Sequence, residues 1–180
     1  NLDVADKSQG SAVYGLDAEL PGMAYAMPLL PPTRYGSQVV QIDERAAKSI
    51  DGYIGAIEIK DPSQTVQACV VVAAETMPAA LKAAKAVTVE WVSGPTAKVT
   101  ESAILEEGAR LASDPEAGAL FVSEGDISAA KARAAGSLTA TYTTSTALHF
   151  TMEPQNALVE FGADGKCHIH AGNQWQSLIL

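Results

Sequence analysis

The sequence predicts a mixed α+β fold, because short alternating strands are interrupted by one clear helix. The strongest observation lies at 67–92, where a β-branched run, an Ala- and Lys-rich stretch and an alternating run follow one another. This order predicts a helix packed on a sheet. The composition agrees, since 47% of the 180 residues are hydrophobic and only 18% are charged, which is typical of a folded chain.

The first third of the chain is predicted to form short strands separated by turns. Strands are expected at 12–20, 23–30, 37–43 and 53–60. "PPTRYG" is excluded from helices and central strands by its prolines. "ERAAKSI" (44–50) is predicted to form about two helical turns that Asp51 and Gly52 close.

The middle of the chain holds the best-defined unit. "QACVVVAA" (67–74) is predicted to be a buried strand, because its β-branched run is continuous. The helix is expected over 76–86, with Thr76 as its cap and Pro78 in its first turn. "VTVEWV" (87–92) alternates and is predicted to be the next strand.

The last part of the chain is predicted to be a connector followed mostly by strands. Residues 93–126 contain one expected helix, 101–111, between proline- and glycine-bearing stretches. Beyond it, "GADG" is predicted to turn 156–161 back onto 166–172 as a hairpin.

Charge and motifs exclude several classes of function. The net charge is −9, with only 12 Lys plus Arg and no basic cluster, which argues against nucleic-acid binding. No apolar stretch is long enough to cross a bilayer. Neither a G-x-G-x-x-G or P-loop phosphate cradle nor a G-x-S-x-G elbow occurs. Cys69 is expected to be an ordinary buried thiol, and a disulfide with Cys167 stays open.

Two groups of residues suggest chemistry but do not complete a site. His168 and His170 would share one face of a strand, yet zinc needs three or four ligands and Cys167 would face the other way, so a plain hairpin strand is favoured. His149 and Glu153 could form an acid/base pair, but Pro154 favours a structural polar pair at a turn. We therefore predict no catalytic and no metal-binding residue from these patterns.

Four stretches, taken in order, resemble the large molybdopterin-binding subunit of the xanthine oxidase family. These stretches are "DVADKSQGSAVYGLDAELPGMAYA", "QVVQIDERAAKSIDGYIGAIEI", "ACVVVAAETMPAALKAAKAVTVEW" and "HFTMEPQNALVEF" with "AGNQWQS". The M-E-P and G-N-Q-W-Q patterns are most similar to isoquinoline 1-oxidoreductase beta subunits and periplasmic aldehyde dehydrogenase large subunits. The resemblance covers nearly the whole chain.

The resemblance implies a division of the chain and a small set of site residues. It implies a hammerhead-like α+β domain over 1–95, a connector with a short helix over 96–135, and the opening strands of the molybdopterin-binding domain over 136–180. Gln174 matches the family glutamine that approaches the molybdenum centre, and Trp175 could line the same surface. His149 and Glu153 match a segment near that centre, with a positioning role.

The resemblance also implies a cofactor, partners and a reaction. The whole enzyme would carry a molybdopterin-type molybdenum cofactor and hydroxylate an aldehyde or N-heterocycle with oxygen from water. Electrons would leave through iron–sulfur clusters on a small 2Fe-2S subunit, with a cytochrome c subunit as a further candidate partner. A periplasmic location is expected, with the cytoplasm as the alternative.

The ends of the sequence suggest a piece of a larger subunit. The chain begins at Asn1 and ends in "QWQSLIL", which the resemblance identifies as the start of a helix with several hundred residues to follow. This segment alone is expected to be inert. The competing interpretation is a stand-alone α+β scaffold or interaction protein without catalysis, and a zinc module using His168 and His170 is a weaker third.

Overall fold

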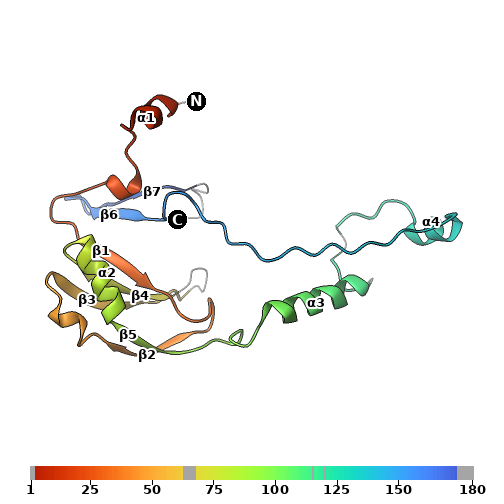
Figure 1. Cartoon of the computed structure of the whole chain (residues 1–180), viewed down its shortest axis with the longest axis horizontal. Helices are drawn as coiled ribbons and strands as arrows, with labels where there is room; N and C mark the ends of the chain where they lie inside the picture. The colour runs from red at the N-terminus through yellow and green to blue at the C-terminus, as the bar shows by residue number, and fades with distance from the viewer. Residues whose placement is uncertain (1–2, 63–67, 115, 120, 174–180) are drawn as a thin grey trace.

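A computed structural model describes residues 3–62, 68–114, 116–119 and 121–173 of the chain. Figure 1 shows a packed unit that holds β1 to β5 and α2, a hairpin of β6 and β7 beside it, and a long arm that carries α3 and α4. The mixture of helices and antiparallel strands confirms the predicted α+β class.

The larger sheet of the packed unit has three antiparallel strands in the order β1-β4-β3. They are β1 (Tyr25–Leu29), β3 (Tyr53–Ile59) and β4 (Cys69–Ala74), which lie within the predicted strand regions. Pro28 lies in β1, which is an edge strand, and an edge is where a sheet tolerates a residue without a backbone N–H.

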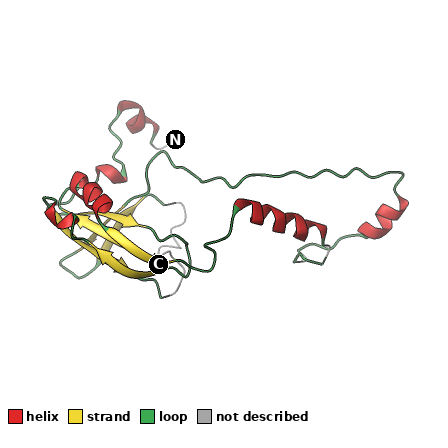
Figure 2. Cartoon of the chain, turned by 60° about the horizontal axis from the view of Figure 1, so that its bottom comes forward, coloured by secondary structure: helices red, strands yellow, loops and turns green. Residues whose placement is uncertain are grey.

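Helix α2 (Met77–Ala86) covers one face of this sheet, as Figure 2 shows in a second view. The predicted cap is confirmed, since Thr76 Oγ1 accepts a hydrogen bond from the backbone N–H of Ala79 at 3.3 Å. The helix turns a row of alanines toward the sheet, and these small side chains let its axis come close to β4. The fully buried residues of β4 are Val70, Val72 and Ala74, and of these Val72 and Ala74 pack in clusters with the helix alanines.

A second, two-stranded sheet pairs β2 (Gln38–Asp43) with β5 (Thr88–Val92). The strands on either side of α2 therefore belong to different sheets, and a bulge between Val39 and Gln41 bends β2. The predicted succession of strand, helix and strand at 67–92 is confirmed.

Three expectations for the packed part of the chain were wrong or too long. Residues 12–20 contain no strand but a short 3₁₀ helix, η1 (Gly15–Asp17), because the Asp17 carboxylate accepts a hydrogen bond from the Tyr14 N–H at 3.0 Å. The helix expected over 44–50 shrinks to η2 (Ala47–Ser49). The strand β4 is buried on one face only, since its even-numbered residues are buried while the odd-numbered ones stay partly exposed.

The arm contains the predicted connector helix and one that no sequence pattern had indicated. α3 (Glu101–Ser113) begins where the Thr100 side chain accepts from the Ala103 N–H at 3.2 Å. α4 (Ile127–Arg133) is capped in the same way by Asp126 at 2.8 Å. At the other end of the chain, α1 (Val4–Gln9) was also unexpected and ends at Gly10 with φ 73°.

The last part of the chain is only partly the run of strands that was predicted. The hairpin of β6 (Ala157–Phe161) and β7 (Cys167–Ala171) is confirmed, with Gly165 in the left-handed conformation (φ 77°) that its turn requires. Residues 137–150, in contrast, form no strand and run extended from the arm back to the hairpin.

A buried threonine, Thr33, joins the proline-rich loop to the segment after β5. Thr33 Oγ1 accepts from the Gly94 N–H at 2.8 Å and lies 2.7 Å from Ser37 Oγ, which ties the proline-rich loop to the segment that leaves β5. A side chain on Gly94 would meet the Tyr35 carbonyl oxygen at 1.9 Å, so this approach requires glycine.

Both thiols are free, so the structure shows no disulfide between Cys69 and Cys167. Cys69 is only half-buried, less than expected, and burial raises the pKa of its thiol. In the part of the chain that the structure describes, no helix is long and apolar enough to span a membrane.

Candidate functional site

An open hollow of about 630 Å³ lies where the extended segment enters the hairpin. Its lining comes from the stretch before β6 and from the end of β7. The lining residues are His149, Thr151, Glu153, Pro154, Gln155, Asn156, Gly172 and Asn173. The predicted cofactor residues Gln174 and Trp175 follow Asn173 directly in the sequence but lie outside the described residues.

Glu153 is the anchor of this hollow. Its Oε1 accepts a hydrogen bond from the backbone N–H of Gly15 at 2.9 Å and lies 3.3 Å from Nδ2 of Asn156. The carboxylate thus joins the N-terminal segment to the stretch before β6. Because this oxygen is already engaged by two donors, Glu153 acts here as a structural acceptor.

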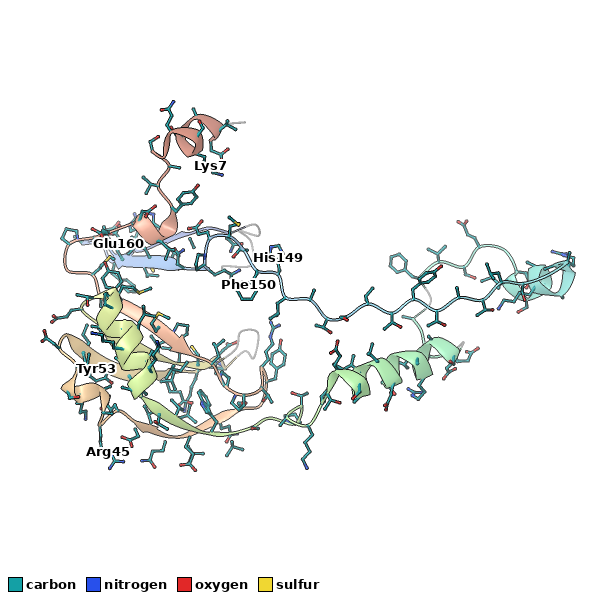
Figure 3. All side chains as sticks on the ribbon, viewed as in Figure 1. Lys7, Arg45, Tyr53, His149, Phe150 and Glu160 are labelled. Carbon is teal, nitrogen blue, oxygen red and sulfur yellow. The ribbon has the colours of Figure 1, made fainter. Side chains whose placement is uncertain are left out.

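His149 and Glu153 line the same hollow, as their spacing suggested, but they are not hydrogen-bonded partners. The contacts of the Glu153 side chain that the structure gives go to Gly15 and Asn156. The His149 side chain is exposed, and Figure 3 shows it where the extended segment reaches the hairpin. The geometry therefore agrees with a structural role for Glu153 at a turn.

Asn156 packs directly against Gly15. Its Nδ2 donates to the Pro154 carbonyl at 2.8 Å, and a side chain added at Gly15 would place its Cβ 2.2 Å from Oδ1 of Asn156. That Oδ1 is buried and has no hydrogen-bond partner among the described residues. An orphaned buried acceptor is unusual and leaves room for a donor from outside these residues.

The chemistry of the hollow suits part of a polar cofactor. Side-chain amides, a hydroxyl and an imidazole offer donors and acceptors without fixed charge, apart from the engaged Glu153. No Lys or Arg lines the hollow, so the described residues give no cationic partner for a phosphate group. They fit the hydrogen-bonding edge of a molybdopterin-type group but not its anionic end.

The two hairpin histidines lie on one face of β7, as predicted. His168 lies opposite Glu160, and Nε2 of His170 is 4.0 Å from Oε1 of Glu160. Cys167 lies opposite Phe161, at the odd register positions of the strand. Within residues 3–62, 68–114, 116–119 and 121–173, no three His, Cys, Asp or Glu side chains come together as a metal site.

A second hollow of about 380 Å³ lies beside the loop that carries Arg34. The Arg34 guanidinium lies over the Tyr35 ring, 5.2 Å from its centroid, and Lys60 pairs with Glu58 at 3.3 Å. Charges of both signs meet there, so the hollow has no preference for one sign of ligand. No sequence motif pointed to it.

The largest pKa shifts occur in the packed unit and not in either hollow. The Arg45 guanidinium and backbone N–H donate to Asp43 and lower its pKa to about 2. Burial, and then the hydrogen bond of 2.7 Å to Glu44, raises the pKa of Tyr53 to about 12. Both groups are explained by local packing and need no catalytic role.

The comparisons with known proteins give one domain match and two curated relatives. The family model described as the molybdopterin cofactor-binding domain matches residues 112–179. The chain is 44% identical, over 99% of its length, to a membrane-bound aldehyde dehydrogenase (pyrroloquinoline-quinone) of Gluconacetobacter polyoxogenes, of which it covers 23%. It is 25% identical, again over 99% of its length, to a nicotinate dehydrogenase polypeptide of Pseudomonas putida, of which it covers 15%.

Among solved structures, quinoline 2-oxidoreductase from Pseudomonas putida 86 matches 51% of this chain and 15% of its own, at 21% identity and a TM-score of 0.40. That score is too low to establish a shared arrangement of the elements. The chain spans less than a quarter of the length of either curated relative.

Proposed function

We propose that this chain is a segment of a molybdenum-dependent oxidoreductase, on the premise that it is related to the large molybdopterin-binding subunits of the xanthine oxidase family. The family model over 112–179 and the relative at 44% identity support this relation. The observation that carries the proposal is the combination of a cofactor-domain match with similarity to an aldehyde dehydrogenase over 99% of this chain.

The proposed reaction of the whole subunit is hydroxylation of an aldehyde or N-heterocycle at carbon. A C–H bond becomes C–OH, the oxygen comes from water, and two protons and two electrons are released. The names of the relatives support both substrate classes, since one is an aldehyde dehydrogenase and the other a nicotinate dehydrogenase. The cofactor supplies the two-electron redox chemistry, and the protein binds and orients the reactants.

The residues of this chain have a supporting role in that reaction. Gln174 and Trp175 are proposed to face the cofactor, with the amide of Gln174 donating a hydrogen bond without adding charge. Gly172 and Asn173 lead into them from β7 and line the hollow that Glu153 anchors. Fixing the end of the hairpin in this way would hold Gln174 and Trp175 in position to contact the cofactor.

The proposed domain division follows the resemblance. Residues 1–95 are assigned to a hammerhead-like domain, 96–135 to a connector, and 136–180 to the opening of the molybdopterin-binding domain. The segment alone is proposed to be inert, because the rest of the cofactor site lies on other parts of the subunit.

The proposed partners are a small 2Fe-2S subunit and a cytochrome c subunit as the electron acceptor beyond it, in the periplasm or, alternatively, in the cytoplasm. The similarity to periplasmic aldehyde dehydrogenase large subunits supports the periplasm. Fractionation of the native host, followed by purification of the native complex and its iron and haem content, tests these assignments.

A second candidate cofactor is pyrroloquinoline quinone, because it appears in the name of the relative at 44% identity. A quinone-dependent aldehyde dehydrogenase would also oxidise aldehydes by two electrons. The match to the molybdopterin cofactor-binding domain favours molybdenum over the quinone.

Metal and quinone analysis of the full-length subunit, purified with its partners, tests the proposal. We expect about one molybdenum per subunit, no pyrroloquinoline quinone in the denatured extract, and oxygen from ¹⁸O-water in the carboxylate product of an aldehyde. Activity with bound quinone and no molybdenum would replace the proposal by the second candidate. A subunit with neither cofactor and no oxidation would support the stand-alone scaffold.

A further inference from the structure

The extended segment between α4 and the hairpin has the sequence pattern of a strand. Its even-numbered positions from 138 to 152 carry Leu, Ala, Tyr, Thr, Thr, Leu, Phe and Met, while the odd positions are mostly Ser and Thr. This period of two, interrupted at Thr144 and Thr146, places the bulky apolar residues on one face of an extended chain. β-branched Thr residues on the other face strengthen the preference for a strand.

The segment also lacks charge. Charged residues make up 18% of the chain, yet no Asp, Glu, Lys or Arg occurs between Arg133 and Glu153. Natural edge strands usually carry charges or prolines that block pairing with another strand. The absence of both from 137–152 is typical of a strand with neighbours along both edges.

In the described part of the chain, this segment has no such neighbours. The side chains of Leu138, Tyr142 and Phe150 are 96%, 91% and 90% exposed, and Met152 is fully exposed. Figure 3 shows His149 and Phe150 on opposite sides of the ribbon, as the alternation requires. Both views show the segment running through open space between α4 and the hairpin.

Its backbone is unpaired as well. Among the described residues, the segment 137–150 has no backbone hydrogen bond, and the ladder begins only at β6. Water can satisfy these groups, but five large apolar side chains on one face of an exposed segment are costly and mark a surface that something covers.

We propose that residues 137–152 form a central strand of a sheet whose other strands come from the remaining part of the same subunit polypeptide. The inference rests on the proposed function to the extent that it assumes a larger subunit. The apolar face at Leu138, Tyr142, Leu148, Phe150 and Met152 packs into that subunit, and main-chain hydrogen bonds form along both edges, over about 50 Å.

The same polypeptide is the favoured occupant for two reasons. The chain matches only 23% of a relative with which it aligns over 99% of its own length, so most of such a subunit lies elsewhere. The match to the molybdopterin cofactor-binding domain contains the whole segment, which supports its place in a folded domain. Covalent connection also gives the partner strands a high effective concentration that a separate chain would lack.

Hydrogen exchange of the full-length subunit, compared with the 180-residue segment, tests the inference. We expect the amides of 137–152 to exchange at least ~100-fold more slowly in the full-length subunit, with consecutive amides protected because both edges are paired. Equal exchange rates in the two proteins would overturn the proposal, and protection of every second amide would overturn the central position. Concentration-dependent protection in the 180-residue segment would assign the surface to a second copy.

Two matched variants of the full-length subunit add a readout that does not depend on exchange. Tyr142→Lys places a charge on the apolar face, whereas Thr141→Lys places it on the neighbouring polar face. We expect Tyr142→Lys to lower the Tm clearly more than Thr141→Lys, and equal effects would contradict the inference. The molybdenum content of the unmodified full-length subunit separates the two proposals. Protected amides in a subunit without molybdenum would contradict the proposed function but still support the strand.

Discussion

The backbone N–H of Gly15 donates a hydrogen bond to Oε1 of Glu153 at 2.9 Å, although 138 positions separate the two residues. The contact brings the N-terminal segment beside the entry to the last hairpin, next to the hollow that precedes Gln174 in the chain. The position of the candidate site thus depends on a segment that contributes no side chain to its lining.

Replacing Glu153 with Ala removes the acceptor of this contact. We expect the free energy of unfolding to fall by about 1–3 kcal/mol, because the Gly15 N–H and the Asn156 amide lose their common partner. Urea denaturation of the full-length subunit measures the change. Glu160→Ala is the matched control, since the described contact of Glu160 is a 4.0 Å approach to His170, and an equal loss in both variants would contradict the role of Glu153.

Gly15→Ala tests the close packing against Asn156. The new Cβ would lie 2.2 Å from Oδ1, so we expect destabilisation of about 1–3 kcal/mol through displacement of the asparagine. Asn156→Ala in the same chain should relieve much of that cost, and a double-mutant cycle measures the coupling. Gly108→Ala, which meets nothing within 4 Å in helix α3, is expected to leave stability unchanged or raise it.

Thr33→Val leaves the buried Gly94 N–H without its acceptor. We expect a loss of about 1–3 kcal/mol in the free energy of unfolding, while Thr33→Ser keeps the hydroxyl and most of the stability. Thermal denaturation of both variants provides the comparison. If valine and serine behave alike, the hydroxyl contributes little and the packing of the loop dominates.

Because the pKa of Tyr53 is raised in the folded chain, we expect the stability to depend on pH at high pH. Its pKa rises from 10.0 to about 12 in the folded chain, so folding favours the protonated form. The stabilisation is fully present below pH 10 and is lost as pH rises toward 12. The difference in unfolding free energy between the wild type and Tyr53→Phe should therefore shrink across this window, and a constant difference would contradict the assignment.

Gln174→Ala tests the proposed contact with the cofactor. In the full-length subunit we expect kcat to fall by about 10–100-fold with KM for the aldehyde little changed, because the amide orients the cofactor and not the substrate. The control Gln9→Ala lies on the exposed helix α1 and should leave kcat unchanged. Trp175→Phe is expected to have a smaller effect, and wild-type kcat in Gln174→Ala would remove this residue from the site.

The periodicity of apolar residues predicted most of the fold. Where the prediction was wrong, contacts that the periodicity does not report decided the structure. The run around Val70 to Val72 and the capped helix after Thr76 follow from local preference, and the structure has both. The segment 12–20 alternates too, but the hydrogen bond from Tyr14 to Asp17 competes with a strand. Residues 137–150 have the alternating pattern of a strand but form none in the structure. Strand pairing needs partner strands, and the local sequence does not reveal them.

The candidate site was predicted less well than the fold. The spacing of His149 and Glu153 correctly indicated polar residues at a turn. Nothing in the sequence, however, identified Gly15 as the partner of Glu153. Short motifs report neighbours along the chain, whereas this contact depends on how the N-terminal segment returns to the hairpin. Asn156 was missed for the same reason, since its role comes from packing against a distant glycine.

The long separation between Gly15 and Glu153 has a consequence for biosynthesis. Translation proceeds from the N-terminus at about 5–20 residues per second, so the acceptor emerges roughly 7 to 28 seconds after the donor. The sheet and helix between residues 25 and 92 have all their mutual contacts by then and can fold on the ribosome. The Gly15 N–H, in contrast, has no Glu153 carboxylate to bind until the stretch before β6 has been synthesised.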